Sequence, residues 1–359
     1  MDGVFLRGRG RQAEKYQIPK YYTKVEDIVS DPEIEVILNL TNPAAHFSTN
    51  MQALEAGKHV YTEKTLAETF EEGKKTVEFA AEKGLRVGVA PDTFMGGRLQ
   101  TARKLLDDGW IGSPIAATTF FAYHGHEVWH PNPFYYYKSG AGPMFDEGPY
   151  YITALLSLLG PAKRVNGNVQ KTFEKRPVLS EPHYGEMMDV EVPTHVTGNI
   201  EFECGAIATV ITSFDIYDCH LPKLEIYGTE GSLSLPEYDP LGGPNVYAGP
   251  LLLRRREESD WWKGYTYTGD LHPATEWREM PLTHGYLEGN HRILGLADMC
   301  AAIQTGRPHR ASGDMGLHAL EIMEGFFTSA QSGKYYEIQT RFTRPEPMEM
   351  NVPEYVFEK

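Results

Sequence analysis

The sequence has little cysteine, no long apolar run and fewer positive than negative charges. Only three cysteines occur in 359 residues, and their spacing matches no metal site, which predicts a reducing compartment such as the cytoplasm. No apolar run approaches the ~20 residues that cross a bilayer, so we expect no membrane partner. The 34 Lys and Arg against 49 Asp and Glu give a net charge of −15, which disfavours nucleic acid as a partner.

The rest of the composition is that of a globular protein, with 41% hydrophobic and 23% charged residues. A chain of this length exceeds most single cores, so two domains are expected. In the first 114 residues, short apolar runs alternate with segments of helical periodicity. The predicted strands are 36–40, 59–61 and 85–90, and the predicted helices are 47–55, 69–83 and 99–107. This alternation predicts a parallel sheet with right-handed helical crossovers.

From residue 115 onward the pattern changes to longer strands followed by helices. The predicted strands are 115–122, 197–202, 206–214, 224–228 and 232–235, and the predicted helices are 151–159, 290–304 and 316–332. This order predicts an open, mainly antiparallel sheet with helices on one face. The expected organisation is therefore an α/β domain over 1–114 and an α+β domain over 115–359.

Polar side chains follow the predicted parallel strands at the edge where such sheets bind ligands. Glu63 and Lys64 come directly after the second strand, where Glu63 is suited to accept a ribose hydroxyl bond. Lys64 is suited to donate a proton or a hydrogen bond to a carbonyl oxygen, although a surface salt bridge is the alternative interpretation. The residues predicted to face a bound cofactor are Thr41, Asn42, His46, Glu63, Lys64 and Asp92.

A carboxylate and a phenol stand four residues apart in the Gly/Pro-rich stretch 140–150. Asp146 is predicted to open a helix, and Tyr150 then shares its face. Such a pair is able to position a substrate hydroxyl and to move its proton. The alternative makes Asp146 a helix N-cap and Tyr150 a core aromatic residue.

The loop over 124–138 is rich in histidine, tryptophan and tyrosine, whose flat faces and polar edges suit a carbohydrate ring. Its histidines also allow a metal site, but their alternate spacing matches no common zinc pattern. Plain loop packing is the third interpretation. No metal is predicted, and the candidate substrate-binding residues are His124, His126, Trp129 and Tyr136.

Five stretches taken together resemble one family. The segments 33–46, 53–65, 109–114, 146–150 and 227–231 are similar in order and spacing to the glucose–fructose oxidoreductase / inositol dehydrogenase / MocA (Gfo/Idh/MocA) family. The resemblance implies a Rossmann-like NAD(P)-binding domain and a second domain with substrate contacts and an oligomer interface. It also implies that Lys64 is the catalytic lysine beside the nicotinamide, and it places Asp146 and Tyr150 on the family's Asp-x-x-x-His pair.

Two departures from the family pattern concern the proposed chemistry. Thr65 stands where proline is usual, which loosens the loop but keeps the charged pair. Tyr150 stands where histidine is usual, and a phenol with an ordinary pKa of ~10 is a weak base at neutral pH. A neighbouring Lys64 cation is expected to lower that pKa. Proton transfer then rests either on Lys64 with Asp146 or on Tyr150.

A third departure lies at the start of the chain, where the first βαβ unit of the family is expected and not found. The stretch from Gly8 to Ala13 fits Gly-x-Gly-x-x-Ala, but only a short apolar run precedes it, so we interpret 7–16 as a helix that follows the missing unit. Without that turn we expect weak dinucleotide binding and an open sheet edge beside 36–40. Three explanations of the missing unit are open: a misplaced start of the chain, a segment or subunit that covers the sheet edge, or a degenerate paralogue. If the start is misplaced, a chain extended upstream should bind NAD(P).

The resulting functional prediction is an NAD- or NADP-dependent oxidoreductase that transfers hydride between nicotinamide and a secondary alcohol of a sugar or polyol. Lys64, Asp146 and Tyr150 are its predicted catalytic residues, and a homo-oligomer, either dimer or tetramer, is expected. Two alternatives remain open at this point. One is a non-catalytic carbohydrate-binding or regulatory paralogue, and the other is a glycosidase that recycles bound NAD.

Overall fold

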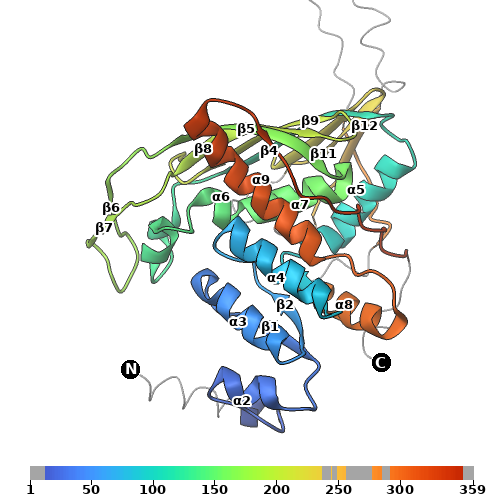
Figure 1. Ribbon diagram of the computed structural model, residues 1–359. Helices are drawn as coiled ribbons and strands as arrows, with labels where there is room; N and C mark the ends of the chain where they lie inside the picture. The colour runs from blue at the N-terminus through green and yellow to red at the C-terminus, as the bar shows by residue number, and fades with distance from the viewer. Residues whose placement is uncertain (1–12, 237–243, 245–248, 256–276, 285–291, 351–359) are drawn as a thin grey trace, which may run out of the picture.

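The computed structural model describes residues 13–236, 244, 249–255, 277–284 and 292–350. The glycines of the stretch 8–13 lie outside these residues, as does most of the predicted helix 7–16. In Figure 1 a large sheet forms the upper layer, a layer of helices lies beneath it, and a smaller sheet with its own helices lies below them.

The smaller sheet has three parallel strands among the described residues, in the order β1 (Val36–Asn39), β2 (His59–Thr62) and β3 (Val87–Val89). This confirms the predicted parallel sheet. The helices α2 (Val25–Ser30), α3 (Pro43–Glu55) and α4 (Phe70–Glu82) belong to this part of the chain. The expected start of α3 at residue 47 is one turn late, because the Asn42 side chain caps the helix and proline is tolerated in its first turn.

The larger sheet has nine described strands in the order β13-β12-β11-β10-β4-β9-β8-β5-β14. Their bounds are β4 (Pro114–Ala122), β5 (Ala162–Gln170), β8 (His195–Phe202), β9 (Ile207–Ser213), β10 (Leu224–Gly228), β11 (Gly231–Leu235), β12 (Leu252–Arg255), β13 (Arg278–Glu279) and β14 (Tyr336–Glu337). The sheet is mainly antiparallel, as predicted. Strands β4 and β9 form its parallel pair, because β9 returns beside β4 only after β5 and β8.

Helices α5 (Gly97–Asp107), α7 (Gly148–Leu159) and α9 (Gly313–Ser332) form the middle layer, with α7 and α9 against the large sheet (Figure 1). Every residue of α7 is buried, which explains why its sequence is apolar on all sides. Helix α9 approaches the sheet closely at Gly198. A Cβ atom there would lie 2.5 Å from the Phe326 ring and 2.0 Å from the Asn166 carbonyl oxygen.

The C-terminal part of the chain returns to the small sheet. Helix α8 (Leu294–Thr305) packs on β3, and the Val89 N–H donates to the Ala311 carbonyl oxygen at 3.0 Å. Strand β4, which begins at Pro114, already belongs to the large sheet. The division into 1–114 and 115–359 stays a prediction, and the segment after residue 292 contacts both sheets.

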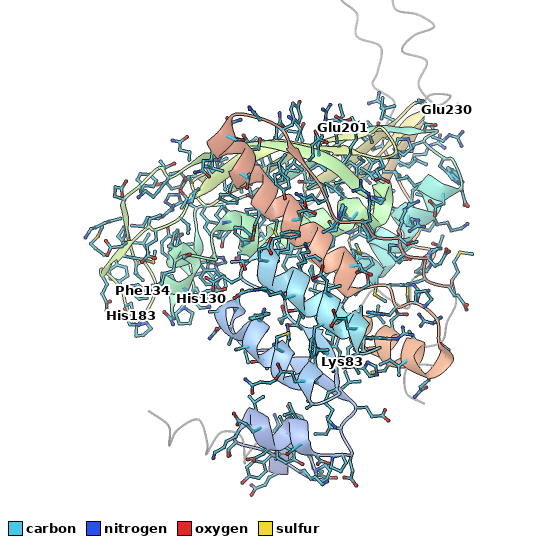
Figure 2. All side chains as sticks on the ribbon, in the orientation of Figure 1. Lys83, His130, Phe134, His183, Glu201 and Glu230 are labelled. Carbon is cyan, nitrogen blue, oxygen red and sulfur yellow. The ribbon has the colours of Figure 1, made fainter. Side chains whose placement is uncertain are left out.

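The aromatic loop 124–138 contains two short 3₁₀ helices, η2 (His126–Val128) and η3 (Pro133–Tyr137), and lies against the hairpin of β6 (Lys175–Pro177) and β7 (Met187–Asp189). Figure 2 places Phe134, His130 and His183 at this end of the molecule. The Ser180 hydroxyl donates to the His130 carbonyl oxygen at 2.6 Å. The hairpin therefore holds the loop in place. None of the described helices is both long and apolar enough to span a membrane.

Candidate active site

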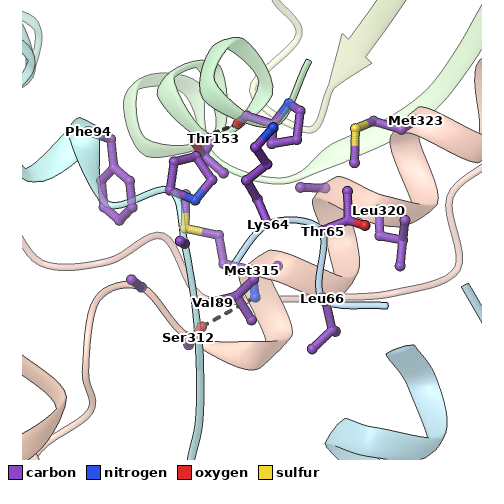
Figure 3. Close-up of a pocket in the computed structure, with 16 residues that line it drawn as sticks. Lys64, Thr65, Leu66, Val89, Phe94, Thr153, Ser312, Met315, Leu320 and Met323 are labelled. Atoms are coloured by element: carbon purple, nitrogen blue, oxygen red, sulfur yellow. Dashed lines mark hydrogen bonds between the residues drawn. The ribbon is translucent and has the colours of Figure 1, made fainter. Parts of the chain in front are cut away.

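Lys64 and Asp146 meet where the two sheets adjoin. The Lys64 Nζ atom donates to the Asp146 Oδ1 atom at 2.6 Å and to the Asp146 main-chain oxygen at 2.6 Å. Figure 3 shows the Lys64 side chain running from the loop after β2 toward α7. The two side chains retain 18% and 11% of their exposure. Residues 82 positions apart in the chain therefore form one partly enclosed ion pair.

Burial and the ion pair act in opposite directions on these two groups. Burial alone lowers the pKa of Lys64, but the Asp146 carboxylate, with Tyr150 and Glu147, raises it well above its ordinary value. Burial alone raises the pKa of Asp146, but the Lys64 ammonium and the His126 hydrogen bond lower it well below its usual range. Lys64 is therefore an ammonium and Asp146 a carboxylate at neutral pH, which makes Lys64 a donor rather than a base.

The expectation that Asp146 opens a helix is wrong. The short helix α6 (Pro143–Asp146) ends there, and α7 begins at Gly148 with Pro149 in its first turn. Proline is tolerated at that position because its missing N–H would have no helical partner. Tyr150 lies in the next helix, with its ring centroid 5.7 Å from the Lys64 Nζ atom. Asp146 and Tyr150 reach Lys64 from two helices rather than from one helix face.

Tyr150 is a buried phenol whose hydroxyl accepts a hydrogen bond from the Arg292 guanidinium at 3.2 Å. Burial raises its pKa, and the nearby Lys64 and Arg292 cations lower it without reversing the change. Lys64 thus lowers this pKa as expected, but burial outweighs its effect, so the net pKa is raised and not lowered. Sequence reasoning misses Arg292, because 142 residues separate it from Tyr150.

His126 lies on the far side of Asp146 from Lys64. Its Nε2 atom is 2.7 Å from the Asp146 Oδ2 atom, and since a carboxylate only accepts, His126 is the donor. Its Nδ1 atom is buried and has no hydrogen-bond partner among the described residues. The ring stacks on Tyr136 with centroids 3.6 Å apart and contacts the Trp129 ring at 5.4 Å. Three of the four predicted substrate-binding residues thus form one cluster, in which His126 contacts Asp146.

His124 is the exception among the four. It stacks on Tyr217 with ring centroids 3.9 Å apart, and its Nε2 atom is 3.2 Å from the Arg176 guanidinium. Burial, and after it the Arg176 charge, lowers the pKa of His124. Arg176 also pairs with Glu127 at 2.6 Å and with Asp215 at 2.7 Å, in a buried network below the aromatic loop. No local sequence signal points to these three charged residues.

A pocket lies at the carboxyl ends of β1, β2 and β3, and we call it the strand-end pocket. Leu40, Glu63 and Pro91 follow the three strands and line it. Arg292 and Ile293, from the segment before α8, line it as well, together with Tyr150. Since Tyr150 also faces Lys64, the pocket and the Lys64–Asp146 pair are neighbours.

Three of the predicted cofactor residues, Thr41, Asn42 and His46, shape the end of β1 and are not among the described residues that line the strand-end pocket. Asn42 caps α3, and the Thr41 hydroxyl donates to the Asn39 side chain at 2.7 Å. His46 is fully buried, with its Nδ1 atom 2.6 Å from the Thr65 carbonyl oxygen and its Nε2 atom 3.0 Å from that of Thr41. These three side chains make hydrogen bonds that stabilise the fold around the end of β1.

Two other predicted cofactor residues, Glu63 and Asp92, do line the strand-end pocket. Glu63 lines it and accepts a bond from the Lys64 main-chain N–H at 3.0 Å. Asp92 lines it and accepts from the Gly295 N–H at 2.7 Å. Thr65 donates to the Ala67 carbonyl oxygen at 2.7 Å, a contact that holds the loop expected to be loosened there. The described residues contain no cluster of His, Cys, Asp or Glu able to hold a metal ion.

Two family models match the chain. Residues 5–90 match the oxidoreductase family model for the NAD-binding Rossmann fold, and residues 99–234 match the GFO/IDH/MocA C-terminal domain. Among curated relatives, 1,5-anhydro-D-fructose reductase of Ensifer adhaerens is 29% identical over 90% of this chain and 85% of its own. D-xylose dehydrogenase of Paenarthrobacter nicotinovorans is 28% identical over 61% of this chain, which spans only 58% of that protein.

Solved structures share the fold at lower identity. An NAD binding oxidoreductase from Klebsiella pneumoniae has a TM-score of 0.75 at 20% identity, over 93% of this chain and 88% of that one. A levoglucosan dehydrogenase in complex with NADH and L-sorbose has a TM-score of 0.73 at 21% identity, over 93% of this chain and 87% of that one. These similarities extend through both sheets.

Proposed function

Because the chain belongs to the Gfo/Idh/MocA oxidoreductase family, we propose that it transfers hydride between NAD or NADP and a secondary alcohol of a neutral sugar or polyol. The observation that carries this proposal is the Lys64 ammonium, fixed by Asp146 beside the strand-end pocket. Relatives whose names include sugar and inositol dehydrogenases support the substrate class.

The strand-end pocket fits the nicotinamide end of such a cofactor. It lies at the carboxyl edge of a parallel sheet, where α/β proteins bind nucleotides. Leu40 and Pro91 offer apolar contacts, and the Glu63 carboxylate offers a hydrogen-bond acceptor. When bound there, the nicotinamide would supply the hydride acceptor or donor. Gly8 and Gly10, the glycines with the Gly-x-Gly spacing, lie outside the described residues.

Lys64 acts on the substrate oxygen. As an ammonium in a partly enclosed site, it stabilises the negative charge that develops when the alcohol becomes a carbonyl, and it polarises the carbonyl in the reverse direction. Asp146 fixes the ammonium through two bonds from Nζ. The proton that leaves the alcohol oxygen is released to solvent beside the Lys64–Asp146 pair, and His126 holds the other Asp146 carboxylate oxygen in place.

The sugar lies against the aromatic loop in this proposal. His126 and Tyr136 form a stacked wall beside Asp146, and Trp129 continues it toward solvent with 51% of its surface exposed. Flat aromatic rings suit the apolar faces of pyranose and polyol chains. With Lys64 already paired to Asp146, the cluster favours an uncharged substrate over a sugar phosphate.

Replacement of Tyr150 with phenylalanine tests the role of its hydroxyl. Because burial keeps the pKa of Tyr150 above its ordinary value, the phenol is a hydrogen-bond donor or acceptor and not a base at neutral pH. We expect kcat/KM to fall about tenfold, with the shape of the pH profile unchanged below pH ~9. Loss of a limb of the pH profile would contradict this assignment. Tyr184→Phe, on the exposed β6–β7 hairpin, is the control and should leave both quantities unchanged.

The function itself is tested by titrating the purified protein with NADH and NADPH, followed by a screen of neutral sugars and polyols with the oxidised cofactors. We expect reversible binding, seen as a change in nicotinamide fluorescence, and net cofactor reduction with at least one sugar. Absence of binding would favour a non-catalytic carbohydrate-binding protein. Cofactor that stays bound through purification without net reduction would favour a hydrolase that recycles it.

We further propose a homo-oligomer, a dimer or a tetramer, that assembles through the face of the large sheet away from α7 and α9. Along β9 the burial alternates, so that Ile207 and Ile211 point to this outer face, and Ile207 is half exposed. Open sheets of this kind need cover. The three unpaired cysteines of the chain support a cytoplasmic location.

A further inference from the structure

The corner that precedes α8 holds a strained residue. Ile293 has φ 81° and ψ 8°, and together with Gln17 it makes up the non-glycine residues with positive φ in the described part of the chain. This region is unfavourable for a β-branched residue, whose Cβ approaches the backbone carbonyl. Ile293 is also 55% exposed, so packing of its side chain does not compensate.

The corner is fixed on both sides by contacts with the site. Arg292 donates to the Tyr150 hydroxyl at 3.2 Å, and the Gly295 N–H donates to the Asp92 carboxylate at 2.7 Å. A side-chain bond of Arg292 and a main-chain bond of Gly295 therefore flank Ile293. Strained backbone that its surroundings fix in this way is concentrated at functional sites.

A second exposed apolar side chain faces the same pocket. Leu40, directly after β1, is 64% exposed and lines the same strand-end pocket as Ile293. The two side chains belong to segments some 250 residues apart in the chain and expose apolar surface to one cavity. A flat ring bound in this pocket and in contact with both side chains would cover that apolar surface.

We propose that Leu40 and Ile293 form an apolar clamp for the nicotinamide ring, and that Ile293 is a positioning residue held in a strained conformation for that purpose. This inference rests on the proposed function and assigns the ring's contacts within the pocket. The nicotinamide ring of the reduced cofactor is uncharged, so apolar burial would supply its binding energy at these two side chains. The positive φ of Ile293 costs free energy in the cofactor-free protein. Burial of the two side chains against the ring would offset that cost only when the ring is bound.

Substitution of Ile293 distinguishes backbone strain from cofactor contact. Relief of the strain should stabilise the protein, whereas loss of the contact should weaken cofactor binding. Ile293→Gly adopts the left-handed conformation freely but removes the clamp side chain. We expect the Tm of the cofactor-free protein to rise by about 1–2 °C. We expect the Kd for NADH or NADPH, whichever binds, to weaken about tenfold. Ile293→Val keeps the branched apolar side chain and should resemble the wild type in both measurements.

Two further variants complete the test. Gln17→Gly relieves positive φ at a site outside the described lining of the pocket, and should raise the Tm without changing the Kd. Leu40→Ser should weaken the Kd without changing the Tm, since Leu40 is mostly exposed. An Ile293→Gly protein with unchanged Tm would refute the strain, and one with raised Tm and unchanged Kd would refute the clamp. A wild-type protein that binds neither cofactor would instead refute the proposed function, and with it the clamp.

Discussion

Replacing Lys64 with methionine is expected to lower kcat for sugar oxidation about 10³-fold while nicotinamide binding is retained. The methionine keeps much of the side-chain volume but removes the ammonium that stabilises the developing negative charge on the substrate oxygen. Single-turnover measurements of cofactor reduction, with the Kd of the cofactor measured in parallel, check this directly. A variant with wild-type turnover would remove Lys64 from the mechanism.

The same substitution also affects stability, because it leaves the Asp146 carboxylate with His126 as its remaining side-chain partner. Removal of one member of a buried ion pair costs about 3–5 kcal/mol at most. The folded-state pKa of Asp146 is lowered, so its contribution exists above the unfolded pKa of ~3.9 and is lost as pH falls further. The folded-state pKa of Lys64 is raised, so its contribution exists below the unfolded pKa of ~10.4 and is lost as pH rises further.

The loss of unfolding free energy in Lys64→Met should therefore be largest between about pH 5 and pH 10. The double variant Lys64→Met with Asp146→Asn is the matched control. It removes the unpaired carboxylate, so it should recover part of the stability while remaining inactive. Recovery of activity in the double variant would contradict the role given to the ammonium.

Replacing Arg176 with methionine is expected to lower the free energy of unfolding by about 3–5 kcal/mol. The guanidinium is almost fully buried and pairs with Glu127 and Asp215, so its removal leaves two buried carboxylates without their cation. Tyr137 donates to Glu127 as well, which ties the aromatic loop to this network. Denaturant unfolding followed by circular dichroism measures the change.

The matched control for Arg176 is its neighbour in the same strand. Lys175 pairs with Asp189 at 3.1 Å, but the two side chains are 61% and 72% exposed. Lys175→Met should therefore change stability by less than about 1 kcal/mol. Where Arg176→Met still folds, we expect a raised KM for the sugar and an unchanged Kd for the cofactor, because the network supports the aromatic loop and not the strand-end pocket. Equal losses in both variants would contradict the special role of the buried network.

The sequence singles out Lys64 because it directly follows a buried strand, and Asp146 because it lies in a Gly/Pro-rich stretch. Both positions are marked by neighbouring residues in the chain. The alternation of strands and helices is predictable for the same reason. No local pattern predicts the parallel pair of β4 and β9, because other strands separate the two in the chain.

The missed residues share one property, which is that their partners are distant in the chain. Arg176 lies 49 residues from Glu127, and Arg292 lies 142 residues from Tyr150. The pKa of Tyr150 lies above its ordinary value because the packing of α7 buries the phenol, whereas the motif shows only the nearby lysine, which acts in the opposite direction. His46 and His124 carry residue types suited to a site, but the fold uses their ring nitrogens in buried contacts.

The measurement that tests the central claim most directly follows deuterium from the sugar to the cofactor. The protein is incubated with NAD or NADP and a neutral sugar or polyol deuterated at its carbinol carbons, and the reduced cofactor is analysed by mass spectrometry and NMR. We predict one deuterium at C4 of the nicotinamide ring with the wild-type protein and about 10³-fold slower transfer with Lys64→Met. Cofactor binding by the wild type without deuterium at C4, for every sugar and polyol tested, would contradict the proposed hydride transfer.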